Sequence, residues 1–222
     1  MCRFLLAKFS EPTSPKIILE KFSSMAKKSK AHDGDWQGDG WGVSWLDTNN
    51  YWKTRKSLLP IWEEKSVFTD FPKTQSLAIH ARSASFPDQK GIIEYNQPFV
   101  DEPYLFVFNG LLKGVSLSSQ DLGKIGSQKI WFLLRKMLDR MTPSQALKKI
   151  KEILLKNSRN LQSLNIGLSD KKNIYSLCYF SKYREYYQLQ YLNNPQVKII
   201  CSEKVEGYTE FRSLEPGKFI EL

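Results

Sequence analysis

The stretch MCRFLL, residues 1–6, opens the chain and decides how the rest of the sequence is interpreted. A cysteine at position 2 is small enough for the initiator methionine to be removed, which leaves a thiol and a free α-amine on the same residue. The reference pKa of an α-amine is about 7.7–8.0, near the pH at which a general base works best, and nearby positive charge acidifies a thiol. Cys2 is therefore a candidate nucleophile that carries its own base, in a chain with 2 histidines.

Hydrolysis of an amide also requires fixed N–H donors where negative charge develops on the carbonyl oxygen. The strand-like stretch YLFVFNG, residues 104–110, ends in a candidate pair. Asn109 offers a side-chain amide, and Gly110 lets a backbone N–H approach a ligand without a Cβ in the way. Taken alone, an Asn-Gly pair after a strand is more often a hairpin turn, so both interpretations stay open.

The stretch IHARSAS, residues 79–85, supplies a third element. Side chains alternate along a strand, so His80 and Arg82 are predicted to point to the same side. Arg82 is suited to hold a carboxylate through two parallel hydrogen bonds, which is how an amino-acid substrate is oriented. A surface ion pair is the alternative for Arg82, and a purely structural role is the alternative for His80.

Composition places the chain among folded globular proteins. Of its 222 residues 41% are hydrophobic and 25% are charged, and we expect one domain over residues 1–222. The 3 cysteines include no CxxC pair, so we expect no metal site and no other cofactor, with Cys178 and Cys201 as buried structural residues.

Charge and hydropathy limit the partners. The net charge of +10 raises the question of nucleic acid, but the lysines are spread along the chain, so we do not expect a nucleic-acid partner. No apolar run approaches the roughly 20 residues that cross a bilayer, and the N-terminus lacks the pattern of a secretory signal. We therefore expect no membrane partner and a cytoplasmic protein, and the oligomeric state is not predicted.

Periodicity gives a coarse secondary structure. Helical spacing of apolar residues predicts helices over 15–28, 127–139 and 143–156, the last beginning with Thr142 as N-cap and Pro143 in the first turn. Strands are predicted at 3–8, 41–46, 76–81, 104–109, 161–169, 173–181, 186–192, 197–203 and 218–222. The order of strands, then helices, then strands predicts an α+β fold in which helices cover sheets.

Several stretches now form a pattern in order and spacing. They are MCRFLL, QGDGWGVSWL (37–46), IHARSAS, NQPFV (96–100), FVFNGLL (106–112), IICSEKV (199–205) and LEPGKFIEL (214–222). Together they resemble the class II glutamine amidotransferases of the N-terminal-nucleophile hydrolase superfamily. The likeness is greatest to the short, stand-alone members that begin MCR and carry GDGWG, and it covers nearly the whole chain.

The resemblance implies a four-layer αββα sandwich and a set of site residues. Cys2 would be the nucleophile, its α-amine the base, and Asn109 with Gly110 the oxyanion hole. Arg82 would bind the α-carboxylate of a small-molecule substrate, glutamine or a γ-glutamyl amide.

The resemblance also places a loop, Gly38 to Gly42, beside the pocket. Trp41 and Gly42 would lead from that loop into a core strand. With His80, we assign these two residues to the substrate-binding set.

The sequence departs from the family at three places. Phe108 and Gln97 stand where the family usually has histidines, although neither position supplies the nucleophile or an oxyanion donor. An aspartate that pairs with the substrate's α-amine is replaced in GSQKIWFLL (126–134) by Ser127 or Gln128. Either Asp121 takes its place, or the amino end of the substrate differs from that of free glutamine, or activity is reduced.

These observations predict an amide hydrolase of the glutamine amidotransferase type that works through a thioester. Beyond a hydrolase fold of about 200 residues the chain has no room for a synthase domain, so ammonia is expected to go to water or to a separate protein. The alternative is a catalytically reduced relative that acts as a binding or scaffold module. Nucleic-acid binding is a third hypothesis that rests on net charge alone.

Overall fold

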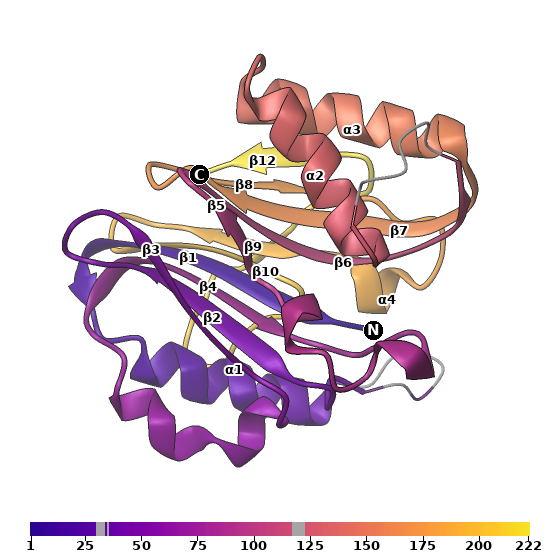
Figure 1. Cartoon of the computed structure of the whole chain (residues 1–222). Helices are drawn as coiled ribbons and strands as arrows, with labels where there is room; N and C mark the ends of the chain where they lie inside the picture. Colours follow the sequence, from indigo (N-terminus) through magenta and orange to yellow (C-terminus); the bar gives the residue numbers. More distant parts are fainter. Residues whose placement is uncertain (30–33, 35, 117–122) are drawn as a thin grey trace.

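The computed structural model describes residues 1–29, 34, 36–116 and 123–222. It consists of two antiparallel sheets packed face to face, with helices against both outer faces (Figure 1). This arrangement is the four-layer αββα sandwich that the resemblance implies, and the predicted α+β class is confirmed. The 7-stranded sheet has the spatial order β11 (Arg212–Ser213), β9 (Gln190–Asn193), β10 (Val197–Cys201), β1 (Arg3–Thr13), β4 (Thr74–Ala81), β2 (Trp41–Leu46) and β3 (Trp52–Ser57).

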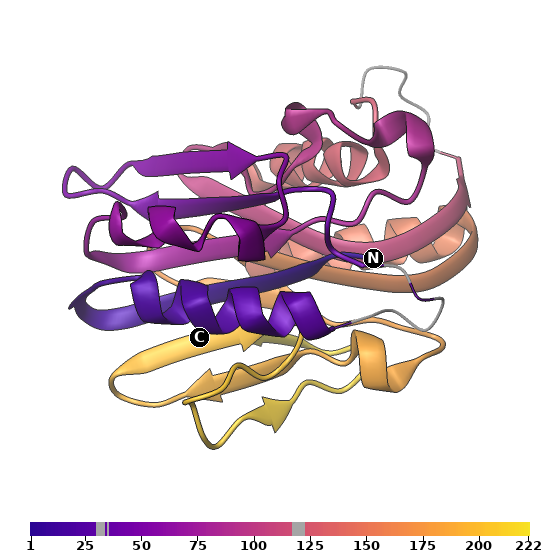
Figure 2. The ribbon, with the colours of Figure 1, turned by 90° about the horizontal axis from the view of Figure 1, so that it is seen from below.

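The second sheet has 5 strands, in the order β12 (Phe219–Glu221), β8 (Ile174–Leu177), β7 (Ser158–Ser169), β6 (Tyr104–Val115) and β5 (Phe99–Asp101). Helix α1 (Lys16–Lys28) lies across the outer face of the 7-stranded sheet (Figure 2). Helices α2 (Gly126–Leu138) and α3 (Pro143–Asn157) cover the other sheet. Short helices complete the chain: η1 (Ile61–Glu63), η2 (Lys65–Thr69), η3 (Pro87–Gln89), η4 (Ile93–Tyr95) and α4 (Arg184–Tyr187).

Strand β1 is apolar on both faces because both are covered. Phe4 and Leu6 belong to the core between the two sheets, whereas Leu5 and Ala7 belong to the core beneath α1. This alternation follows from the two-residue period of a strand. The same period directs the side chain of Cys2 toward the second sheet.

The helices begin and end close to their predicted bounds. Ile18, Leu19 and Phe22 give α1 the apolar face that packs on the first sheet. The hydroxyl of Thr142 accepts a hydrogen bond from the backbone N–H of Gln145 at 3.3 Å, which confirms the predicted N-cap of α3. No helix in the described ranges is long and apolar enough to cross a membrane.

Some segments differ from the sequence-based expectation, and three of them are informative. Strand β3, with the polar sequence WKTRKS, was not predicted, because it is an edge strand whose exposed residues need no apolar alternation. The stretch 186–192 was predicted as one strand, but Tyr186 and Tyr187 lie in α4. The hairpin turn at Asn109 and Gly110 is wrong, since β6 continues to Val115 and Gly110 pairs with Leu164 of β7.

Gly42 offers a test of how closely the segments pack. A Cβ at this position would lie 2.2 Å from the backbone oxygen of Gln97, so Gly42→Ala forces the backbone apart. We expect Gly42→Ala to lower the free energy of unfolding by about 1–3 kcal/mol, measured by urea denaturation. Gly38→Ala is the matched control, because its Cβ would make only ordinary contact with Trp62 at 3.8 Å. Equal unfolding midpoints for the two variants would contradict the packing described here.

Candidate active site

A cavity of about 370 Å³ opens where strand β1 and helix α2 both begin. Its walls come from the first residues of the chain, the segment after β4, strand β6 and the first turn of α2. Cys2, Arg82, Asn109 and Gly110 all line it, although they are far apart in the sequence. The volume lies within the range of about 300–1,000 Å³ typical of small-molecule sites.

Cys2 lies at the start of β1, where the register with β4 sets its neighbours. Arg3 pairs with Ala81, so Cys2 comes next to the segment that follows β4. Its Sγ lies 3.6 Å from the carbonyl oxygen of Ser83, and the N–H of Ser83 donates to Sγ at 3.5 Å. The thiol is therefore held at the cavity wall by a backbone segment that also carries Arg82.

The other two thiols lie elsewhere. Cys178 and Cys201 are fully buried in the cores, as predicted, and Cys2 is partly exposed. Burial raises the pKa of Cys178 to about 11 and also raises the pKa of Cys201. Both are thus protonated and inaccessible at neutral pH.

Asn109 presents an amide to the cavity from within strand β6. Its side chain is 1% exposed, and within the described residues neither Nδ2 nor Oδ1 has a hydrogen-bond partner. An unsatisfied buried amide costs about 1–3 kcal/mol, so a ligand that accepts its hydrogen bond is strongly favoured. At Gly110 a Cβ would lie 2.4 Å from the ring of Phe108 and 2.5 Å from the oxygen of Ser163, which leaves room for glycine alone.

Arg82 is a buried cation whose hydrogen bonds go to neutral acceptors. Its side chain donates to the Oδ1 of Asn96 at 3.3 Å and to the carbonyl oxygen of Gln89 at 2.7 Å. Burial lowers the pKa of the Arg82 guanidinium, while Cys2 and Asp39 act in the opposite direction. The residue is 4% exposed, which argues against a surface ion pair. Such a cation favours an anionic group in the cavity.

His80 and Gly42 lie behind the cavity, in contact with two residues that line it, Phe108 and Gln97. None of His80, Trp41 and Gly42 is among the described residues that line it. His80 is buried between the sheets, with Nε2 3.3 Å from the carbonyl oxygen of Phe108, and Gly42 packs against Gln97. Trp41 faces the other core and donates from Nε1 to Oε2 of Glu64 at 2.8 Å.

Gln97 and Phe108, two departures from the family pattern, contact each other. Oε1 of Gln97 accepts from the backbone N–H of Phe108 at 2.5 Å, and its Nε2 donates to the carbonyl oxygen of Phe108 at 3.3 Å. A glutamine satisfies both groups because it carries a donor and an acceptor. This pair holds the strand immediately before Asn109.

Ser127, which stands where the resemblance implies an acidic residue, lines the cavity from the first turn of α2. Gln128 is turned to the helix end instead, where its Oε1 accepts from the backbone N–H of Lys124 at 2.9 Å. Asp121, the alternative carboxylate, lies outside the described residues. The described lining carries two cationic side chains, Arg82 and Lys129.

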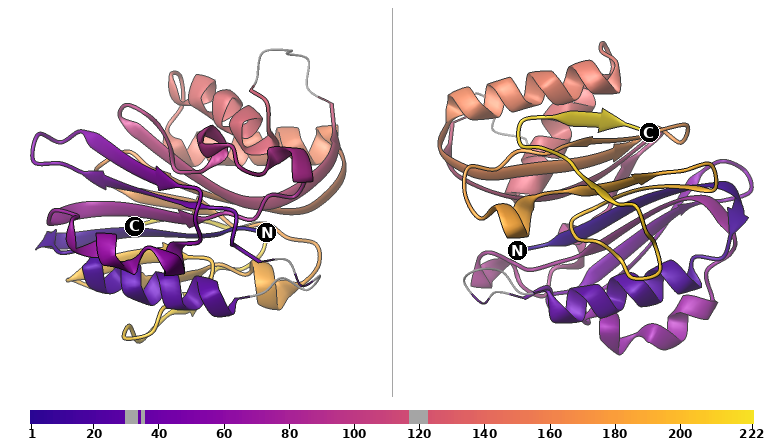
Figure 3. Two further views of the ribbon diagram at one scale, coloured as in Figure 1. Left: turned by 60° about the horizontal axis from the view of Figure 1, so that its bottom comes forward. Right: turned by 180° about the vertical axis from the view of Figure 1, so that it is seen from behind.

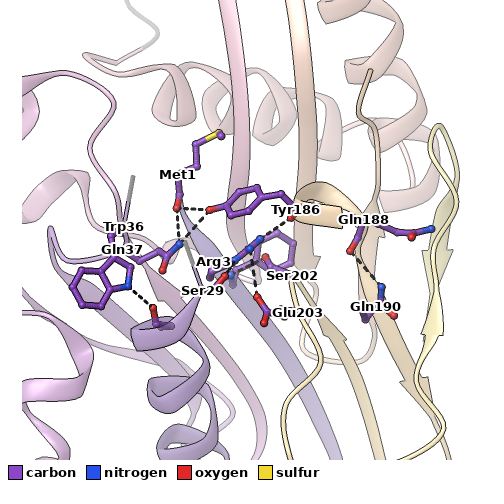
Figure 4. Close-up of polar contacts among 12 residues, drawn as sticks. Met1, Arg3, Ser29, Trp36, Gln37, Tyr186, Gln188, Gln190, Ser202 and Glu203 are labelled. Carbon is purple, nitrogen blue, oxygen red and sulfur yellow. Dashed lines mark hydrogen bonds and ion pairs between the residues drawn. The ribbon is translucent and has the colours of Figure 1, made fainter. Parts of the chain in front are cut away.

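A polar network around Met1 was not predicted from the sequence. The carbonyl oxygen of Met1 accepts hydrogen bonds from Nε2 of Gln37 at 3.1 Å and from the hydroxyl of Tyr186 at 2.9 Å (Figure 4). The N-terminus lies beside α4 in both views of Figure 3, which explains how Tyr186 reaches it. No local signal in the sequence could have found this contact.

Comparison with known proteins identifies the fold through similar structures and not through similar sequences. No family model and no curated protein matches the sequence. The structure is similar to that of a glutamine aminotransferase class-II domain protein from Silicibacter pomeroyi, with a TM-score of 0.64 and 15% identity over 99% of this chain and 94% of that one.

Two larger proteins are also similar in structure. One is glutamine phosphoribosylpyrophosphate amidotransferase from B. subtilis, with a TM-score of 0.69 and 15% identity over 100% of this chain and 47% of that one. The other is described as the allosteric regulatory enzyme of purine biosynthesis, with a TM-score of 0.71 and 17% identity over 100% of this chain and 46% of that one. The chain thus has the fold of class II glutamine amidotransferase domains, as its motifs predicted, and spans about half the length of these two proteins.

His80 provides a test of the buried wall. Burial lowers the pKa of His80 from 6.5 to about 3, although its contact with Phe108 acts in the opposite direction. Because this pKa is lower in the folded state, the unfolded state takes up a proton first as the pH falls below about 6.5. In a His32→Gln background, we expect imidazole NMR to show that His80 stays neutral down to about pH 4. The free energy of unfolding should fall as the pH is lowered from about 6.5 to about 4. An imidazole that titrates near pH 6.5 would exclude the buried position.

Proposed function

We propose that the protein is an amide hydrolase of the glutamine amidotransferase type. In this proposal Cys2, made N-terminal by removal of Met1, attacks the γ-amide of glutamine or of a γ-glutamyl compound. The observation that carries the proposal is that a partly exposed thiol, an unsatisfied amide donor and a buried cation line one cavity. Their residues are Cys2, Asn109 and Arg82.

The reaction has two halves. In the first, Sγ of Cys2 forms a bond to the γ-carbonyl carbon while the α-amine takes the thiol proton. The negative charge that develops on the carbonyl oxygen is stabilised by Nδ2 of Asn109 and the N–H of Gly110. The C–N bond then breaks, the α-amine returns the proton to the leaving ammonia, and a thioester remains.

In the second half, water attacks the thioester carbon and gives its proton to the α-amine. The C–S bond breaks, the γ-carboxylate leaves, and the thiol recovers its proton. Arg82 binds the α-carboxylate and holds the substrate in place through both halves. Ammonia passes to water or to a separate accepting protein, and the proposed steps require no metal or cofactor.

Ser127 favours a second candidate function. Its hydroxyl stands where a carboxylate would pair with the α-amine of free glutamine, which weakens the case for that substrate. A relative that uses the same cavity as a binding or scaffold module is the alternative. The two functions differ in whether Cys2 reacts.

Covalent labelling tests the nucleophile. We expect a glutamine-mimicking diazoketone to modify the mature protein at Cys2 alone, because Cys178 and Cys201 are buried and serve as internal controls. Peptide mass mapping locates the label, and intact mass verifies that Met1 has been removed. Ammonia release from an amide substrate is expected to be lost in Cys2→Ala. A folded, mature protein whose Cys2 stays unlabelled would instead support the binding module.

A carboxylate at position 127 tests the substrate's orientation. We expect Ser127→Asp to lower the KM for free glutamine about tenfold, because a charge-assisted hydrogen bond to the ammonium is gained. Ser127→Asn is the matched control, since it adds similar bulk without charge. If both variants change the KM equally, the substrate's amino end does not lie near Ser127.

A further inference from the structure

Two hydrogen-bond donors meet at the carbonyl oxygen of Met1, next to the proposed catalytic residue. They are the hydroxyl of Tyr186 and Nε2 of Gln37, at 2.9 and 3.1 Å. Gln37 and Tyr186 are also bonded to each other, since Nε2 of Gln37 donates to the hydroxyl oxygen of Tyr186 at 3.2 Å. The hydroxyl oxygen thus accepts from Gln37, and its own hydrogen is directed to Met1.

Tyr186 is held firmly in this position. The guanidinium carbon of Arg3 lies 3.6 Å from the centre of the Tyr186 ring, and Nη1 of Arg3 donates to the Tyr186 carbonyl oxygen at 2.7 Å. Arg3 is itself fixed by Ser29, at 2.7 Å, and by Glu203, at 3.4 Å. Figure 4 shows these contacts as one cluster between the start of β1 and α4.

Removal of Met1 takes away the acceptor that both donors share. The lost oxygen and the nitrogen of Cys2 are bonded to one carbon atom, so they are at most about 2.6 Å apart, the sum of two bond lengths. Rotation of the freed residue about its Cα–C bond would carry the new amine toward the hydroxyl. Gln37 is 0% exposed, and its Oε1 has no partner within the described residues, so an acceptor for an amine N–H is also present.

We propose that in the mature protein the hydroxyl of Tyr186, positioned by Gln37 and Arg3, donates a hydrogen bond to the α-amine nitrogen of Cys2. A hydrogen bond to the lone pair stabilises the neutral amine, which is the form that acts as a base. Tyr186 and Gln37 are therefore positioning residues, and this inference rests on the proposed function of Cys2.

The charges that face the amine act in the same direction. From β1, Arg3 presents a buried cation, and Arg82 presents another from the segment after β4. His80 is neutral, and Tyr187 of α4 presents a second phenol. The carboxylate of Glu203 is engaged with Arg3, and that of Asp39 with Lys90. Burial raises the pKa of the Tyr186 hydroxyl, which therefore remains a donor at neutral pH.

An NMR titration tests the inference without relying on turnover. In mature protein carrying Cys2→Ala, 13C-labelled alanine reports the α-amine without a titrating thiol on the same residue. We expect its pKa to lie below the reference value of about 7.7, and to rise by about 0.7 in Tyr186→Phe, the equivalent of one hydrogen bond. Tyr187→Phe is the matched control and should leave the pKa unchanged, because the Tyr187 hydroxyl accepts from Gln162 and contacts the side-chain sulfur of Met1, not the backbone next to Cys2.

Gln37→Leu is a second variant, which keeps the test open if Tyr186→Phe does not fold. It removes the donor that orients the hydroxyl, so the amine pKa should rise here too. An amine pKa at the reference value, or one that the Tyr186 and Gln37 variants do not change, would overturn the inference. If the pKa behaves as expected but wild-type protein hydrolyses no amide, the proposed function fails and the hydrogen bond stands.

In active protein, the same shift should appear in the pH dependence of kcat/KM. The acidic limb should move to higher pH by the same amount in Tyr186→Phe but not in Tyr187→Phe. A uniform loss of rate at every pH, with no movement of the limb, would indicate a merely structural role for Tyr186.

Discussion

The pairing of strand β1 along both of its edges fixes where Cys2 lies in the cavity, and the other site residues are arranged around it. β10 lies on one side and β4 on the other, with Leu5 opposite Cys201 and Ile79. A strand bonded on two sides cannot slip by one residue, because a slip would exchange its inward and outward faces. The register therefore fixes the direction of Cys2 and brings it to the segment that carries Arg82 and Ser83. A thiol on a fraying end could not be held in this way.

On the second sheet, contacts to one backbone carbonyl, that of Phe108, fix the position of the neighbouring Asn109 at the cavity. The oxygen of Phe108 is contacted by His80, from the first sheet, and by Gln97, from the segment before β5. Asn109 follows directly, so its amide is positioned by contacts to its neighbour and needs none of its own. A polar group left unsatisfied in this way, beside a rigid strand, is typical of a site that a ligand completes.

Sequence reasoning identified the site residues that local motifs and strand periodicity reveal. The motifs around Cys2, Arg82, Asn109 and Gly110 could be selected by residue type and strand period, and the structure brings these four to one cavity. Sequence reasoning could not find Tyr186, because its contact with Met1 joins residues 185 positions apart. Because tyrosine favours strands, the sequence predicts a strand over residues 186–192. In the structure, Tyr183 adopts a left-handed conformation with φ of 56°, and the chain turns into α4 there.

The burial of Met1 has a consequence for biogenesis. Met1 is 6% exposed and packs among Tyr186, Tyr187 and Leu111. In the folded chain this residue is therefore inaccessible to an aminopeptidase. Strand β10, one of the two partners of β1, begins at Val197. At about 5–20 residues per second, roughly 10–40 s of synthesis separate β1 from that partner. Under the proposed function, removal of Met1 would therefore have to precede folding, and a chain that folds first would keep Met1 and lack the free α-amine on Cys2.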